Sequence, residues 1–151
     1  MPPRPARADD LLAVQTVVMR AFAGYVPRLL QRPAPMSFDY DAYRRAEQIH
    51  VVEGEPDVHP LRGIIVLVPH PGHLAVDVLA VDPSVQGQGV GRALMAFAED
   101  HARALELGEL QLYTNAKMTE NLDFYPRLGY LESGRETVKR FERVRFRKLL
   151  A

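Results

Sequence analysis

The first regular pattern along the chain is that of an amphipathic helix. Its apolar positions recur every three to four residues: Leu11, Val14, Val18 and Phe22. This spacing predicts a helix over residues 11–23, with Asp9 or Asp10 as its N-terminal cap. The next segment, 25–41, is rich in proline and aromatic residues and has no sustained period. We therefore expect a short helix and a loop there, followed by a helical turn over 41–46.

The pattern then changes to that of strands. Residues 49–53 and 61–68 are rich in β-branched side chains, and they predict two strands separated by a turn at 54–57. A Pro-His-Pro-Gly reversal over 69–72 leads into a third strand over 73–81. We expect the second and third strands to form an antiparallel hairpin.

Helices and strands alternate in the last part of the chain. A helix is expected over 89–107, a strand over 110–114, a helix over 120–128 and a terminal strand within 138–150. The order is helices, then a hairpin, then strand–helix–strand–helix–strand. It predicts an α/β (α+β) fold with a mixed, mostly antiparallel central sheet flanked by helices on both faces.

Composition narrows the function classes. With 151 residues, 47% hydrophobic and 25% charged, the chain suits one core, so we expect a single domain over 1–151. Nineteen basic and nineteen acidic residues give a formal net charge of +0, which argues against a general electrostatic attraction to nucleic acid or membrane. The absence of cysteine excludes disulfides, thiolate nucleophiles and Cys-ligated metals. With no signal-peptide pattern and no spanning apolar run, we expect a cytoplasmic protein.

Three glycines within five residues mark the entrance to the long helix. They are Gly87, Gly89 and Gly91, within the segment VDPSVQGQGVGR at 81–92. Each glycine in a helical turn costs up to about 1 kcal/mol relative to alanine, so the cluster needs a reason. Without Cβ atoms, an anion can reach the exposed N–H groups of the first turn, where the helix dipole favours negative charge. A pyrophosphate would fit there.

Two well-known phosphate motifs do not match this segment. No lysine follows the glycines, which disfavours a nucleotide-hydrolysing P-loop. Arg92 stands where the third glycine of the dinucleotide fingerprint belongs. On the hexapeptide alone, a flexible glycine loop that begins an ordinary helix is the alternative.

A second motif downstream supplies the missing context. LAVDP at 79–83, then Gln86-x-x-Gly89-x-Gly91, then NLDFYPRLGY at 121–130 together resemble the GNAT superfamily of N-acetyltransferases. The resemblance runs from about Leu61 to the C-terminus and is weaker before it. It implies the GNAT fold and an acetyl-coenzyme A-dependent enzyme that acetylates a primary amine by direct attack in a ternary complex.

The resemblance also implies a set of cofactor-binding residues. In the family the Q-x-x-G-x-G turn wraps the pyrophosphate, and the end of the preceding strand hydrogen-bonds the pantetheine arm like an added strand. Carried over, the set is Leu79, Ala80, Val81, Gln86, Gly87, Gln88, Gly89, Val90, Gly91, Arg92 and Asn121. Many members have an asparagine where this chain has Met118, and Asn115 and Asn121 flank that position.

Two residues are implied as catalytic groups. Asp77 occupies the strand position where many members carry a glutamate that acts as a base, and alternation places it on one face with Leu79 and Val81. A solvated strand residue or a substrate anchor is the alternative for Asp77. Tyr125 matches the family's general acid, which protonates the leaving thiolate; a core tyrosine is the alternative. Pro126 directly after it is unusual and is expected to kink the helix.

Other polar groups receive simpler interpretations. His70 and His73 bracket a turn without a cysteine or carboxylate cluster, so no metal site is expected. Arg143, Arg145 and Arg147 alternate on the last strand. They are interpreted as charges that protect an edge strand, with a phosphate or nucleic-acid patch as the alternative.

The acceptor remains open at the level of sequence. A small-molecule or peptide amine is expected, and Asp39, Asp41 and Asp77 would suit a cationic substrate. A homodimer is compatible with the family. A non-catalytic coenzyme A-binding or sensing module is the competing function, and in it Asp77 and Tyr125 would be structural.

Overall fold

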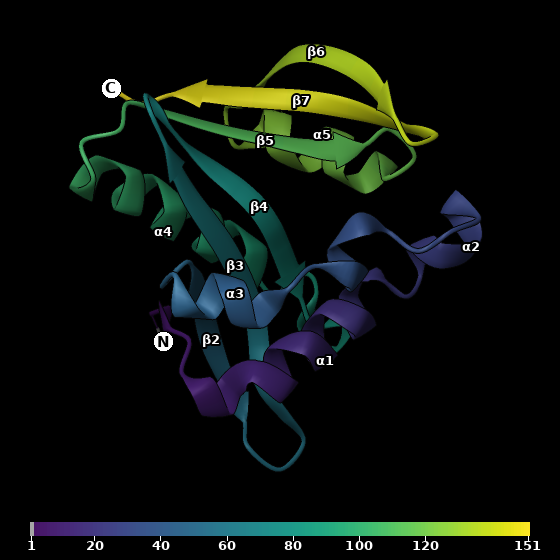
Figure 1. Cartoon of the computed structure of the whole chain (residues 1–151), viewed down its shortest axis with the longest axis vertical. Helices are drawn as coiled ribbons and strands as arrows, with labels where there is room; N and C mark the ends of the chain where they lie inside the picture. The colour runs from purple at the N-terminus through teal and green to yellow at the C-terminus, as the bar shows by residue number, and fades with distance from the viewer. Residues whose placement is uncertain (1) are drawn as a thin grey trace. The chain divides into compact units, whose positions relative to one another are not determined.

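A computed structural model describes residues 2–151 (Figure 1). Along the chain its elements are β1 (Arg4–Pro5), the 3-10 turn η1 (Ala8–Asp10), α1 (Leu11–Phe22), α2 (Tyr25–Leu29), η2 (Ala34–Ser37), α3 (Tyr40–Arg45), β2 (Ile49–Glu55), β3 (His59–His70), β4 (His73–Val81), η3 (Pro83–Val85), α4 (Val90–Ala104), β5 (Glu109–Asn115), α5 (Thr119–Arg127), β6 (Leu131–Val138) and β7 (Phe141–Leu149).

The fold class predicted from the sequence is confirmed. The strands are hydrogen-bonded neighbours in the order β1-β2-β3-β4-β5-β7-β6. The pairs β1/β2, β2/β3, β5/β7 and β6/β7 are antiparallel, whereas β4 and β5 pair in parallel. The chain divides into two compact units: one runs to Leu67 and includes Val78–Phe97, and the other comprises Val68–Asp77 and Ala98–Ala151.

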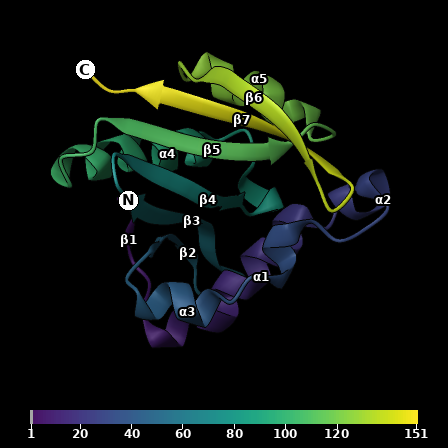
Figure 2. The same cartoon turned by 45° about the horizontal axis from the view of Figure 1, so that its top comes forward.

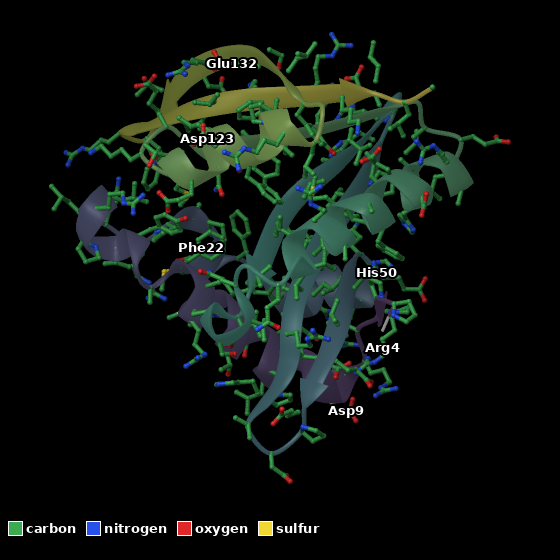
Figure 3. The ribbon with its side chains drawn as sticks, turned by 180° about the vertical axis from the view of Figure 1, so that it is seen from behind. Arg4, Asp9, Phe22, His50, Asp123 and Glu132 are labelled. Carbon is green, nitrogen blue, oxygen red and sulfur yellow. The ribbon has the colours of Figure 1, made fainter. Side chains whose placement is uncertain are left out.

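The first unit covers both faces of its strands with helices. In it α1 and α3 lie over one face of β2 and β3, and the beginning of α4 lies over the other (Figures 1 and 3). The central residues of β3, from Ile64 to Leu67, are consecutively buried because neither face meets solvent. Packing is close at Gly63, where an added Cβ would come within 3.0 Å of the Ala80 carbonyl oxygen and 3.1 Å of Leu94 Cδ1.

An ion pair, rather than the predicted helix cap, secures the N-terminal segment of this unit. Asp10 makes no side-chain cap bond to α1. Its carboxylate instead accepts hydrogen bonds from Arg4 Nη1 at 2.8 Å and from the Arg7 backbone N–H at 2.7 Å. The Arg4 side chain, labelled in Figure 3, also donates to Glu53 at 2.6 Å. The hydrogen bond from Arg4 lowers the pKa of Asp10 despite its burial.

The second unit contains a hairpin, β6–β7, of which the sequence pattern predicted only the second strand. The strands β5, β7 and β6 lie side by side, and α5 covers one face of them (Figure 2). The segment LESGRETV of β6 has too few apolar residues to show alternation. Lys139 and Arg140 make the turn with left-handed φ values of 48° and 71°. Strand β7 therefore lies between β5 and β6, so the interpretation of its arginines as protection of an edge strand is wrong.

The tight approach of the β2–β3 hairpin gives a first prediction. An ideal Cβ added at Gly54 would lie 2.3 Å from the His59 carbonyl oxygen, which is backbone and cannot turn aside. Gly54→Ala should lower the free energy of unfolding by about 1–3 kcal/mol, as overpacking usually does. Urea denaturation followed by circular dichroism measures the difference.

The matched control is Gly108→Ala, where an added Cβ would meet nothing within 4 Å. We expect that variant to stay within about 0.5 kcal/mol of wild type. Equal stability of the Gly54→Ala variant and wild type would contradict the described hairpin packing.

Candidate cofactor and catalytic residues

The glycine turn of the first unit owes its composition to backbone conformation. Gly87 and Gly89 have φ values of +81° and +84°, in the left-handed region that other residues avoid. A Cβ added at either position would meet nothing within 4 Å, so the space around the turn is open. Gly91 lies inside α4. The glycines therefore allow the chain to turn and leave its amides uncovered.

Several amides of this turn have no backbone partner. The Gln88 N–H donates to the Val85 carbonyl at 3.3 Å, and the Ala93 N–H donates to the Gly89 carbonyl at 3.0 Å. Between Gln88 and Ala93, four N–H groups donate to no backbone carbonyl of residues 2–151. They belong to Gly89, Val90, Gly91 and Arg92. Gly87 shares this property. Donors of this kind at a helix start favour an anion.

Asp82 anchors the start of this turn. Its side chain is almost fully buried, and its carboxylate accepts from the Ser84 N–H at 3.0 Å and the Ser84 hydroxyl at 2.7 Å. Arg20 of α1 donates to the same carboxylate from Nε at 2.8 Å and from Nη2 at 3.3 Å. Burial alone would raise the pKa of Asp82, but the hydrogen bonds from Arg20 and Ser84 together lower it well below the usual range. No local pattern in the sequence marks Asp82 or Arg20 as a site residue.

Strand β4 alternates as predicted. Asp77, Leu79 and Val81 share one half-buried face, and Ala80 belongs to the opposite, buried face. In the second unit the parallel register of β4 with β5 comprises Leu74↔Leu110 and Ala75↔Gln111 among the described residues. The strand continues beyond this short pairing through Asp77.

Tyr125 lies in the interior of the second unit. It is 6% exposed, near the end of α5, and its ring contacts Phe124, Tyr130 and Phe146 at centroid distances of 5.1, 5.9 and 5.8 Å. Pro126 lies inside α5, which continues to Arg127, so the proline does not end the helix at that point. Gly129, with φ of +93°, follows the helix as the sequence suggests.

The two asparagines near Met118 serve local structure. Asn121 donates from Nδ2 to the Thr114 hydroxyl at 3.0 Å, which connects α5 with β5. Asn115 accepts a hydrogen bond from the Lys117 N–H at 2.9 Å. Met118 is buried, and its sulfur lies 3.6 Å from the Thr114 hydroxyl. The position that an asparagine occupies in many relatives is here part of the packing.

Two of the acidic residues considered for a cationic substrate, Asp39 and Asp41, make local contacts within α3. Asp39 caps α3 by accepting from the Ala42 N–H at 3.0 Å. Asp41 forms ion pairs with Arg44 at 2.8 Å and Arg45 at 3.5 Å. Their expected role toward a substrate finds no support in these contacts, because both carboxylates stabilise the same short helix.

The arginines of β7 are also partnered. Arg145 pairs with Glu136 and Arg147 with Glu109, while the Arg143 guanidinium lies 4.1 Å from the centre of the Tyr113 ring. In the part of the chain that the structure describes, no group of three or more His, Asp or Glu side chains is suited to hold a metal ion. None of the helices described is long and apolar enough to cross a bilayer.

The predicted site residues fall into two groups. The end of β4 at 79–81 and the turn at 86–92 belong to the first unit. Asp77, Asn121 and Tyr125 belong to the second. A groove of about 700 Å³ in the first unit was not predicted; the residues that line it are Glu53, Gly54, Glu55, Val58, His59, Arg62, Ser84, Val85 and Gln88. It adjoins the turn through Gln88.

Comparison with known proteins establishes the family. The model of the acetyltransferase (GNAT) family matches residues 16–130, so the chain belongs to this family, as its motifs indicate. A mycothiol acetyltransferase of Pseudarthrobacter chlorophenolicus is 37% identical over 73 residues, which are 48% of this chain and 21% of that protein. The peptidyl-lysine N-acetyltransferase YjaB of Salmonella typhimurium is 36% identical over 63 residues, which are 42% of this chain and 40% of that protein.

These matches span less than half of either relative. A likeness in fold extends over the whole chain. The crystal structure of the NatC complex bound to Gag peptide and CoA contains a chain with a TM-score of 0.73 and 18% identity, covering 100% of both chains. The expected GNAT fold and family are thereby confirmed.

The buried Asp82 carboxylate gives a second prediction. Asp82→Asn should lower the free energy of unfolding by about 2–4 kcal/mol at neutral pH, because it removes the charge that Arg20 and Ser84 stabilise. Since the folded-state pKa of Asp82 is depressed, its contribution is complete above the unfolded pKa of about 3.9 and is lost as the pH falls further.

Urea titrations at several pH values check this sign. The difference in the free energy of unfolding between wild type and Asp82→Asn should stay constant from neutral pH to about pH 5 and become smaller below about pH 4. Asp57→Asn, a change on an exposed turn, is the control and should have little effect at neutral pH. A difference in unfolding free energy that grows on acidification would show that the Asp82 carboxylate is not stabilised as described.

Proposed function

We propose that this protein is an acetyl-coenzyme A-dependent N-acetyltransferase that transfers the acetyl group to a primary amine by direct attack in a ternary complex. The observation that carries the proposal is the set of unbonded N–H groups at the beginning of α4, in a chain of the GNAT family. Residues 1–151 act as one acetyltransferase domain in this proposal, and the protein is cytoplasmic.

The turn from Gln86 to Arg92 binds the pyrophosphate of the cosubstrate. Its backbone N–H groups donate to the phosphate oxygens, the dipole of the 15-residue helix α4 favours their charge, and Gln86 and Arg92 add side-chain donors. The backbone of Leu79–Val81 hydrogen-bonds the pantetheine arm. The coenzyme A named for the NatC crystal structure supports this choice of cosubstrate.

Removal of a proton from the acceptor is the first chemical requirement. Deprotonation of an alkyl ammonium with a pKa of about 10.4 costs about 4–5 kcal/mol at pH 7. Asp77 accepts this proton, directly or through a water molecule, or it binds the ammonium as an anchor. Its place on the half-buried face of β4 with Leu79 and Val81 supports both roles.

Collapse of the tetrahedral intermediate completes the reaction. The amine nitrogen forms a bond to the thioester carbonyl carbon, and the carbon–sulfur bond breaks. Tyr125 gives its phenolic proton to the departing thiolate, and the nitrogen gives up its surplus proton, which restores the phenol, so the products are an amide and the free thiol of coenzyme A. The burial of Tyr125 among aromatic rings is the observation that favours the competing function, a coenzyme A-binding or sensing module.

The acceptor is a small-molecule or peptide amine. The matched relatives are named for mycothiol and for peptidyl-lysine, which supports amine acetylation without choosing between the two sizes of acceptor. Detection of free thiol from acetyl-coenzyme A in the presence of a panel of amines separates the enzyme from the sensing module. Binding of the cosubstrate without thiol release from any amine would support the module.

The left-handed turn gives a third prediction, on cosubstrate affinity. Gly89→Asp places a carboxylate beside the proposed pyrophosphate and strains a residue with φ of +84°. Binding of acetyl-coenzyme A, measured by calorimetry, should weaken at least about 100-fold because like charges repel at short range.

Gly72→Asp is the matched control, since Gly72 has φ of +87° and equally open surroundings on the β3–β4 turn. It imposes the same backbone strain without a charge at the proposed anion site. Unchanged affinity in the Gly89→Asp variant would refute the assigned turn.

The proposed acid gives a fourth prediction. Tyr125→Phe keeps the ring contacts in the second unit and removes the proton, so kcat should fall about 10²-fold while the affinity for acetyl-coenzyme A is nearly unchanged. Tyr113→Phe, on a ring that is 40% exposed, is the control and should leave kcat unaltered. Full turnover in the Tyr125→Phe variant would remove Tyr125 from the mechanism.

A further inference from the structure

Tyr130 stands out because its hydroxyl is buried and has no partner. The residue is 1% exposed, and its hydroxyl has no hydrogen-bond partner among the residues that the structure describes. A buried polar group in this state has lost its hydration without compensation, so a phenylalanine would suit the packing better. The hydroxyl is therefore a candidate for a role that appears only when another charge develops nearby.

The contacts of Tyr130 lead directly to the proposed acid. Its ring packs edge-on against the ring of Tyr125, with centroids 5.9 Å apart and planes inclined at 68°. Its backbone N–H also donates to the Tyr125 carbonyl at 3.1 Å, across the turn at Gly129. Tyr130 thus contacts both the side chain and the main chain of Tyr125.

Lys148 of β7 holds this arrangement in place. Its ammonium donates to the Leu128 carbonyl at 2.7 Å and forms an ion pair with Glu99 of α4 at 3.1 Å. The same ammonium lies 5.8 Å from the centre of the Tyr130 ring. An added Cβ at Gly129 would come within 3.2 Å of the lysine chain, so the end of α5 is closely packed against it.

The titratable and charged groups around Tyr130 come from three elements. They are Tyr125 on α5, Glu99 on α4 and Lys148 on β7. Burial raises the pKa of Tyr130, and the charges of Glu99 and Tyr125 raise it further. Tyr130 accordingly keeps its proton at neutral pH, and its O–H is present there as a donor.

We propose that Tyr130 is a positioning residue for Tyr125. Its ring sets the orientation of the Tyr125 ring, and its otherwise unpartnered O–H dipole stabilises the negative charge on the Tyr125 oxygen as the proton leaves for the thiolate. This inference rests on the proposed function of Tyr125. A hydroxyl that has no partner before the reaction and interacts with charge that develops during it stabilises the transition state rather than substrate binding.

Tyr130→Phe tests the hydroxyl separately from the ring. We expect kcat to fall about tenfold with an unchanged KM for acetyl-coenzyme A, as for loss of an interaction made only in the transition state. Without the neighbouring dipole the pKa of Tyr125 rises, so the alkaline limb of the kcat profile should move to higher pH. The urea midpoint should be equal to or higher than that of wild type, because the variant no longer buries an unpartnered hydroxyl.

Tyr40→Phe is the matched control. Tyr40 is also a buried tyrosine with a raised pKa, but its hydroxyl donates to the Pro35 carbonyl at 2.6 Å. Its loss should lower the urea midpoint and leave the alkaline limb in place. A shifted alkaline limb without a lower urea midpoint in Tyr130→Phe, together with a lower midpoint without a shifted limb in Tyr40→Phe, would support the proposal. A Tyr130→Phe variant with the kcat and alkaline limb of wild type would overturn it.

A measurement that does not need turnover separates this inference from the proposed function. NMR titration of ring-labelled tyrosine, with Tyr125 assigned by its absence in Tyr125→Phe, reports the pKa of Tyr125 directly. We expect that pKa to be higher in Tyr130→Phe than in wild type. An unchanged value overturns the coupling, whereas absence of thiol release from wild type with every amine contradicts the proposed function alone.

Discussion

The hydrogen-bonded ion pair of Asp82 with Arg20 is the interaction on which the first unit depends. It places a buried carboxylate between α1 and the end of β4, and the same carboxylate orders Ser84 in η3. The turn with its open amides begins only a few residues later. A buried charge is stable only when its partners are in place, so this pair gives the loop a defined starting point.

From this anchor, the backbone conformation explains the exposed amides. Gly87 and Gly89 adopt left-handed φ values, which let the chain reverse into α4 without filling the space above it. The donors of the first helical turn are then left to an external anion. Local stability and the proposed binding of a pyrophosphate therefore have the same structural origin.

In the second unit, aromatic packing rather than ion pairing sets the geometry around the proposed acid. Tyr125 lies among Phe124, Tyr130 and Phe146, and rings in edge-on or tilted contact restrict one another's orientation. A phenol in such surroundings is well ordered. The neighbouring Tyr130, whose hydroxyl is buried and has no partner among the described residues, gains its proposed importance from this ring contact.

The sequence by itself determined the periodic elements and the family, because alternation in β4, helical spacing in α1 and the Q-x-x-G-x-G and YPRLGY motifs are local properties. It missed β6, whose polar residues carry no alternation, and it misplaced β7 at an edge. Only the tertiary structure showed that Asp10 pairs with Arg4, that Asp82 pairs with Arg20 across 62 positions, and that the Tyr130 hydroxyl is buried alone. Such partners are chosen by packing between distant segments, which no local pattern records.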